Sequence, residues 1–65
     1  NTDQAVLQYE AILEENPQSA EALIRLGDIY EETGNPERAR FYWRRVVTEV
    51  DPENREAIER LERQQ

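Results

Sequence analysis

The sequence predicts an all-α fold in which four short helices form antiparallel hairpins. Apolar residues recur at helical spacing in four segments, and the segments are separated by short breaks that carry proline or glycine. The chain also matches itself at a fixed distance, which is typical of helical arrays. At a distance of 34 residues, Ala5, Tyr9, Ile12 and Leu13 recur as Ala39, Trp43, Val46 and Val47. At 35 residues, Pro17, Ala22, Leu23 and Leu26 recur as Pro52, Ala57, Ile58 and Leu61.

The first helix is predicted from about Asp3 to Glu15, with Thr2 or Asp3 as its N-cap. The Asn16-Pro17 pair ends it, because a residue before proline is pushed out of the helical region. The apolar stripe of this helix consists of Ala5, Val6, Tyr9, Ile12 and Leu13.

The second helix is predicted to start after Ser19, which is a suitable N-cap, and to end at Gly34. A glycine at that position accepts the left-handed backbone geometry that often closes a helix. Leu23, Leu26, Ile29 and Tyr30 follow the spacing of an amphipathic helix. Gly27 lies where the two helices of a hairpin would approach closely, with Ala39 as the small residue in the facing helix.

The third helix is predicted to begin with Asn35 as its cap and Pro36 in its first turn. It carries Ala39, Tyr42, Trp43, Val46, Val47 and Val50. After the Asp51-Pro52 break, a fourth helix from about Glu53 to the end carries Ala57, Ile58 and Leu61. Because every connection is only a few residues long, successive helices must be antiparallel neighbours.

The change of period from 34 to 35 indicates a single inserted residue among Thr48, Glu49 and Val50. One extra residue rotates a helix by about 100°. The third helix must therefore absorb the insertion locally, or the fourth helix will be displaced.

Composition restricts the function classes. The chain has 65 residues, no cysteine and no histidine, so disulfides, Cys/His zinc sites and the usual nucleophile–base pairs are excluded. The net charge of −7 opposes binding to nucleic acid or anionic membranes. The adjacent carboxylates Glu14-Glu15 and Glu31-Glu32 are best interpreted as solvated helix faces rather than calcium or acid–base sites. We expect no catalytic, cofactor-binding or metal-binding residues and no direct membrane insertion, and a soluble, cytoplasmic protein is slightly favoured.

The segment Phe41-Tyr42-Trp43-Arg44-Arg45 is the one basic, aromatic-rich stretch, and it could stack on single-stranded nucleic acid. Five consecutive helical residues point all around the axis, however, so they cannot form one face. We therefore interpret Tyr42 and Trp43 as core and Phe41 as partly exposed.

The pattern of residues along the whole chain resembles the tetratricopeptide repeat. The third helix is also similar to the half-a-TPR repeat of RNA-processing proteins. Leu26-Gly27 and Tyr30 match the first helix of the repeat, Ala39, Trp43 and Val46 its second helix, and Pro52 its closing proline. The resemblance divides a single domain, residues 1–65, into a second-helix half repeat (3–16), a full repeat (20–52) and a terminal half repeat or capping helix (53–65). Leu23 replaces the tryptophan often found in the family, and Leu61 is followed by Glu62 instead of glycine.

The resemblance implies a concave surface formed by the first helix of each hairpin. The positions implied here as partner-binding are Glu21, Ile24, Arg25, Asp28, Glu32, Glu56, Glu59, Arg60 and Arg63. The arginines among them are candidates for gripping an acidic group. Alternatively, they pair with glutamates one turn away, such as Glu21 with Arg25 and Glu56 with Arg60.

We predict a non-catalytic scaffold that binds a protein, as a peptide or helix, in this concave groove. The alternative is a homo-oligomer, because the first helix has no preceding helix to cover some of Val6, Leu7, Ile12 and Leu13. The half repeats at both ends lead us to expect a scaffold cut from, or completed by, a larger array.

Overall fold

A computed structural model of the chain describes residues 1–64 and confirms the all-α fold. The helices are α1 (Thr2–Glu15), α2 (Ala20–Glu32), α3 (Pro36–Arg45) and α4 (Arg55–Arg63). The π-helical turn η1 (Val46–Val50) continues α3 without a break.

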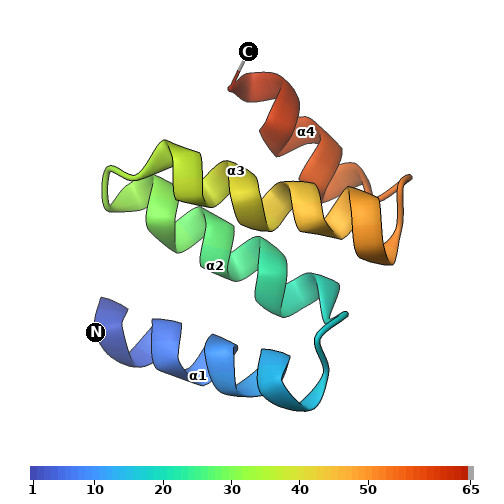
Figure 1. Cartoon of the computed structure of the whole chain (residues 1–65). Coiled ribbons are helices and arrows are strands. Elements are labelled where there is room, and N and C mark those ends of the chain that lie inside the picture. Colours follow the sequence, from blue (N-terminus) through green and yellow to red (C-terminus); the bar gives the residue numbers. More distant parts are fainter. Residues whose placement is uncertain (65) are drawn as a thin grey trace.

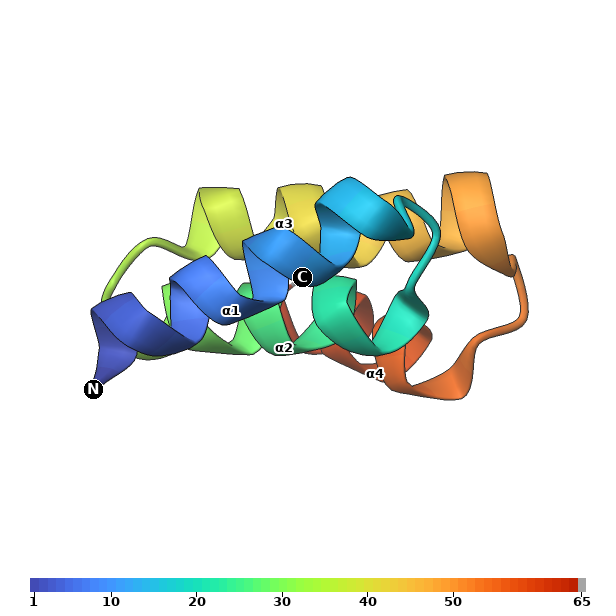
Figure 2. The same cartoon turned by 90° about the horizontal axis from the view of Figure 1, so that it is seen from below.

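The helices form two layers. Seen from below, α1 and α3 lie in one layer and α2 and α4 in the other (Figure 2). Consecutive helices run antiparallel, and α1 and α3 run in the same direction (Figure 1). We call the α2–α4 layer the inner layer and the α1–α3 layer the outer layer. No helix within residues 1–64 is both long and apolar enough to span a bilayer.

The helix ends follow the capping chemistry of the sequence, with one correction. Ser19 Oγ accepts from the backbone N–H of Ala22 and Asn35 Oδ1 accepts from that of Arg38, as predicted. At the first helix, however, Asn1 is the cap: its Oδ1 accepts from the N–H of Asp3 at 2.9 Å. Asn1 precedes the helix, so its side-chain oxygen can reach the free N–H groups of the first turn. Thr2 and Asp3 already lie within the helix and therefore do not cap it.

The other helix boundaries lie close to prediction. Gly34 has a φ of +86°, the left-handed geometry expected at the end of α2. The fourth helix begins at Arg55 instead of about Glu53, because Asn54 accepts from the N–H of Ala57 and caps it there.

Trp43 and Gly27 form the closest contact between α2 and α3. The indole of Trp43 is fully buried, and its Nε1 donates to the carbonyl oxygen of Ile24 at 3.3 Å. A Cβ atom at Gly27 would lie less than 3.0 Å from three atoms of the indole ring. Gly27 therefore admits Trp43, and not primarily Ala39. Trp43 fills the interior of this hairpin, whereas Tyr30 stacks on Tyr42, with ring centroids 5.7 Å apart.

The remaining core joins α2, η1 and α4. Leu23, Ile24, Val46 and Ala57 form one buried cluster. Partly buried apolar residues surround it, namely Leu13, Ala20, Tyr42, Val47 and Val50. Trp43 and Tyr42 thus lie in or beside the core, and Phe41 is exposed, as the sequence predicted.

The inserted residue is absorbed in η1. The N–H of Asp51 donates to the carbonyl oxygen of Val46 at 2.8 Å, which spans five residues instead of the four of an α-helix. The chain thereby takes up one extra residue inside a single turn and still delivers Ala57 to the core. The insertion that the sequence placed among Thr48–Val50 lies within this turn.

Gly27→Ala is expected to destabilise the protein despite the higher helix propensity of alanine. Overpacking against Trp43 should cost about 1–3 kcal/mol, which exceeds the gain of about 1 kcal/mol in propensity. Urea unfolding followed by circular dichroism measures the change in unfolding free energy.

The matched control introduces Gly27→Ala into a Trp43→Phe background, where the smaller ring leaves room for the methyl group. The cost of Gly27→Ala should then shrink, which gives a measurable coupling in the double-mutant cycle. An equal cost in both backgrounds would contradict the steric explanation.

Candidate partner-binding groove

The inner layer holds the residues that the sequence assigned to partner binding. Glu21, Ile24, Arg25, Asp28 and Glu32 lie on α2, and Glu56, Glu59, Arg60 and Arg63 lie on α4. The two helices lie in the same layer (Figure 2), and ion pairs join them.

Asp28 is the centre of the ion-pair network on the surface shared by α2 and α4, which we call the candidate groove. Arg60 reaches across from α4 and donates to both carboxylate oxygens, through Nε at 2.6 Å and through Nη2 at 3.1 Å. Arg25 donates to Oδ2 of the same carboxylate at 3.4 Å. Arg60 also donates to the backbone oxygen of Glu56. One carboxylate therefore anchors two arginines and fixes α4 to α2, in the two-pronged geometry that guanidinium favours.

The surroundings of Arg60 favour its protonated form. The hydrogen bond to Asp28 raises the pKa of Arg60 above its ordinary value, partial burial opposes this, and the nearby carboxylates of Glu56 and Glu59 add to the rise. An arginine is always protonated in proteins, so the bridge to α2 has a permanent donor.

The helical pairs suggested for these arginines are wrong. Within residues 1–64, Arg25 pairs with Asp28 and not with Glu21, and the side chain of Arg60 pairs with Asp28 and not with that of Glu56. The carboxylate of Asp28 is partly buried and lies within reach of Arg25 on its own helix and of Arg60 on α4. A solvated glutamate on the same helix stabilises such a pair less.

The assignment of Ile24 is also wrong. Its side chain is 2% exposed, belongs to the core cluster and cannot contact a partner while the helices stay packed. The helical wheel places Ile24 near the groove, but its side chain belongs to the buried cluster with Leu23, Val46 and Ala57.

Glu31 is a groove residue that the sequence analysis missed. Its carboxylate lies 3.6 Å from Nη2 of Arg63. Both cross-helix pairs, Asp28–Arg60 and Glu31–Arg63, join residues 32 positions apart. A search for opposite charges near the repeat distance would have found this second pair.

The free charges of the groove are acidic. Glu21, Glu32, Glu56 and Glu59 are exposed, and none of them forms an ion pair within the described residues. In the same part of the chain, residues 1–64, no group of three or more potential ligands is placed to hold a metal ion. The groove therefore offers a rim of solvated carboxylates around a rigid Arg25–Asp28–Arg60 centre.

Arg60→Gln is expected to lower the free energy of unfolding by about 1–2 kcal/mol, because it removes charge-assisted hydrogen bonds from a partly buried carboxylate. The matched control is Arg63→Gln, whose longer and more exposed pair should contribute less than about 0.5 kcal/mol. Thermal and urea unfolding of both variants test this difference. Equal losses would show that Asp28–Arg60 does not fix α4.

Comparison with known proteins agrees with this architecture. The tetratricopeptide repeat family matches residues 1–61, which is nearly the whole chain. A search of curated proteins and a search of solved structures each find no significant match. The match, the helical hairpins and the contact of Gly27 with Trp43 lead to one conclusion: the chain belongs to the tetratricopeptide repeat family.

Proposed function

We propose that this chain binds a basic segment of a partner protein in the α2–α4 groove, without catalysis. Tetratricopeptide repeats generally mediate protein–protein interactions and are typically non-catalytic. The observation that supports the basic partner is the charge left free on the groove rim: Glu21, Glu32, Glu56 and Glu59.

The groove arginines are poorly placed to grip an acidic partner. Arg60 is engaged by both oxygens of Asp28, and Arg63 is near Glu31. A partner carboxylate would have to displace these internal acceptors. A lysine or arginine of a partner would instead meet free carboxylates on both helices, which favours a cationic segment through complementary charge.

A helix or extended peptide fits this surface better than a small molecule does. The rim charges lie on two separate helices, about one helical turn or more apart along each, so a ligand must be long to contact both. The protein partner is thus a segment with basic residues on one side.

A second candidate function, self-assembly through the end of the array, is favoured by the exposure of α1. No residue of α1 is buried, and the side chain of Ile12 is 45% exposed. Ile12 borders a hollow with Ala11, Glu15 and Asn16 at this end of the molecule. A second helix packed there would cover it.

For the groove, titration of the ¹⁵N-labelled protein with a lysine-rich helical peptide should shift amide signals of α2 and α4. Because each exposed ion pair contributes up to about 1 kcal/mol, Glu56→Gln/Glu59→Gln should weaken binding roughly three- to tenfold. The control Glu37→Gln, which changes an exposed carboxylate on α3 outside the inner layer, should leave the affinity unchanged. Preference for an acidic peptide over the basic one would contradict the proposal.

For end-to-end assembly, sedimentation velocity over a range of concentrations should show association that Ile12→Gln abolishes, since a polar side chain there removes the apolar contact. The neighbouring Glu15→Gln serves as a control that keeps Ile12. A monomer at every concentration would remove this second function.

A further inference from the structure

The outer layer carries two equivalent stripes of exposed residues. Residues at steps of 4, 3, 1 and 3 share one side of an α-helix. On α1 this stripe is Asp3, Leu7, Glu10, Ala11 and Glu14, and on α3 and η1 it is Glu37, Phe41, Arg44, Arg45 and Thr48. The two sets are 34 positions apart, so the repeat places them on the same outward side. All are exposed except Arg45, which is half-buried.

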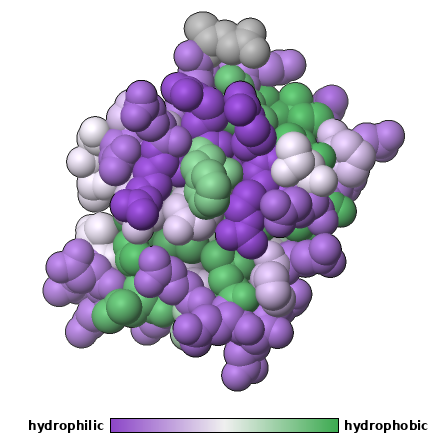
Figure 3. All heavy atoms as spheres, in the orientation of Figure 1, coloured by the Kyte–Doolittle hydropathy of each residue, from purple (hydrophilic) through white to green (hydrophobic). Residues whose placement is uncertain are grey.

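Each stripe has a large apolar residue that the fold leaves uncovered. Leu7 is 65% exposed and Phe41 is 57% exposed, and they occupy equivalent repeat positions. In the space-filling view of this side, an apolar side chain over α3 is surrounded by strongly hydrophilic ones, and further apolar surface lies toward α1 (Figure 3). Neither residue belongs to the buried core, so each is available to contact a second molecule.

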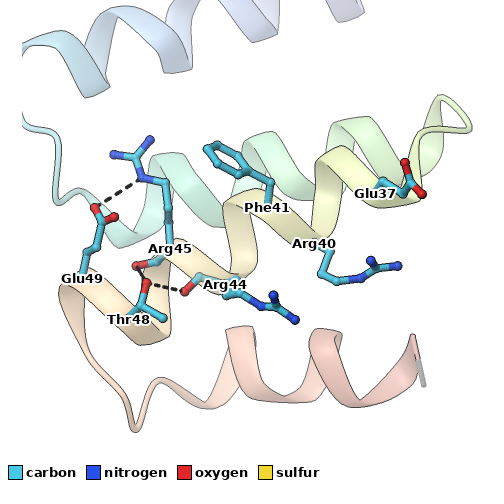
Figure 4. Close-up of a pocket in the computed structure, with 7 residues that line it drawn as sticks. All are labelled: Glu37, Arg40, Phe41, Arg44, Arg45, Thr48 and Glu49. Carbon is cyan, nitrogen blue, oxygen red and sulfur yellow. Dashed lines mark hydrogen bonds and ion pairs between the residues drawn. The ribbon is translucent and has the colours of Figure 1, made fainter.

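The two stripes carry opposite net charge. The α1 stripe has three carboxylates, Asp3, Glu10 and Glu14, and α1 contains no basic residue. The α3 stripe has two arginines, Arg44 and Arg45, against one carboxylate, Glu37, and it lines a shallow hollow with Arg40 (Figure 4). Phe41 and Arg45 project on the α1 side of this helix, whereas Arg40 and Arg44 project on the α4 side (Figure 4).

Arg44 is the cation of this hollow that remains available. Arg45 pairs with Glu49 at 3.5 Å and donates to the carbonyl oxygen of Pro17, and Arg40 donates to Gln64. Within residues 1–64, Arg44 forms no ion pair and no side-chain hydrogen bond. Its exposed guanidinium lies on the other flank of α3 from Phe41, so the two together suit a segment with both an acidic and an apolar side chain, as the α1 stripe has.

We propose that the outer layer pairs with the outer layer of a second copy of this chain. A two-fold axis parallel to the helices, between α1 and α3, places the α1 stripe of each copy on the α3 stripe of the other. Leu7 then meets Phe41 of the second copy and Glu10 meets Arg44, and the symmetry repeats both contacts. The surface is therefore complementary to itself.

Charge selects this arrangement over its alternatives. A two-fold axis across the helices would place α1 on α1, acidic on acidic, and α3 on α3, where both stripes are net basic. Like charges in direct opposition are unfavourable, so the pairing of α1 with α3 is specific. The proposed surface shares no residue with the groove and only Ala11 with the hollow at the array end, so the proposal can fail while either proposed function holds.

Charge-reversal variants test the pairing in the intact chain. Sedimentation velocity of the natural sequence should show a dimer that forms with rising concentration and weakens with added salt. Glu10→Arg/Glu14→Arg makes both stripes basic, and Arg44→Glu/Thr48→Glu makes both acidic. Each variant alone should dimerise at least roughly tenfold more weakly, whereas an equimolar mixture should form a heterodimer. The variant carrying all four changes should dimerise again, since its stripes are complementary with reversed sign.

Leu7→Gln and Phe41→Gln provide a second test that leaves the charges intact. Both residues are exposed, so the variants should keep the native circular dichroism spectrum and lose the dimer. The proposal is overturned by a natural sequence that stays monomeric, by reversals without effect on a dimer, or by a mixture of the two reversal variants that does not associate. A dimer lost only with Ile12→Gln would assign assembly to the array end. A monomer that binds an acidic peptide at Arg44 would assign this face to another protein.

Discussion

The contact between the Trp43 indole and Gly27 is the constraint on which the rest of the structure depends. It sets the separation of α2 and α3, because the indole fills the space that a side chain on α2 would occupy. The indole N–H binds the carbonyl oxygen of Ile24, so the ring is fixed in rotation as well as in depth. With this hairpin fixed, Leu23, Leu26 and Val46 are fully buried and the groove side of α2 faces outward.

The position of α4, and with it the second wall of the groove, depends on how η1 accommodates one residue. A regular α-helical continuation would turn the chain by about 100° and carry Asp51-Pro52 away from the start of α4. The wider turn ends on Asp51 and returns the chain to the core side. Asp28 and Arg60 then meet across the groove, and Gln64 reaches back to Arg40 and to the carbonyl of Pro36 at the start of α3. The network that gives the groove its charge pattern is therefore a consequence of a local change in backbone hydrogen bonding.

Much of the fold could be predicted from the sequence because its signals are local. Ser19, Asn35, Gly34 and Pro36 act within one turn of their own positions, and the repeat spacing predicts the order of the hairpins. The groove was predicted less well because its contacts join residues on different helices. A helical wheel indicates that Arg25 and Arg60 lie on one side, but not that both converge on Asp28. It also places Ile24 at the margin of the groove, whereas the packing of α2 against Val46 and Ala57 makes Ile24 core.

The burial of Trp43 also gives the molecule an internal optical reporter. The chain has one tryptophan, and this tryptophan lies at the contact that holds the central hairpin together. Its fluorescence therefore originates from one known environment, free of overlapping signals from other indoles. Fluorescence excited at the red edge of the protein's absorption therefore reports the packing of α2 on α3 directly, without an attached dye.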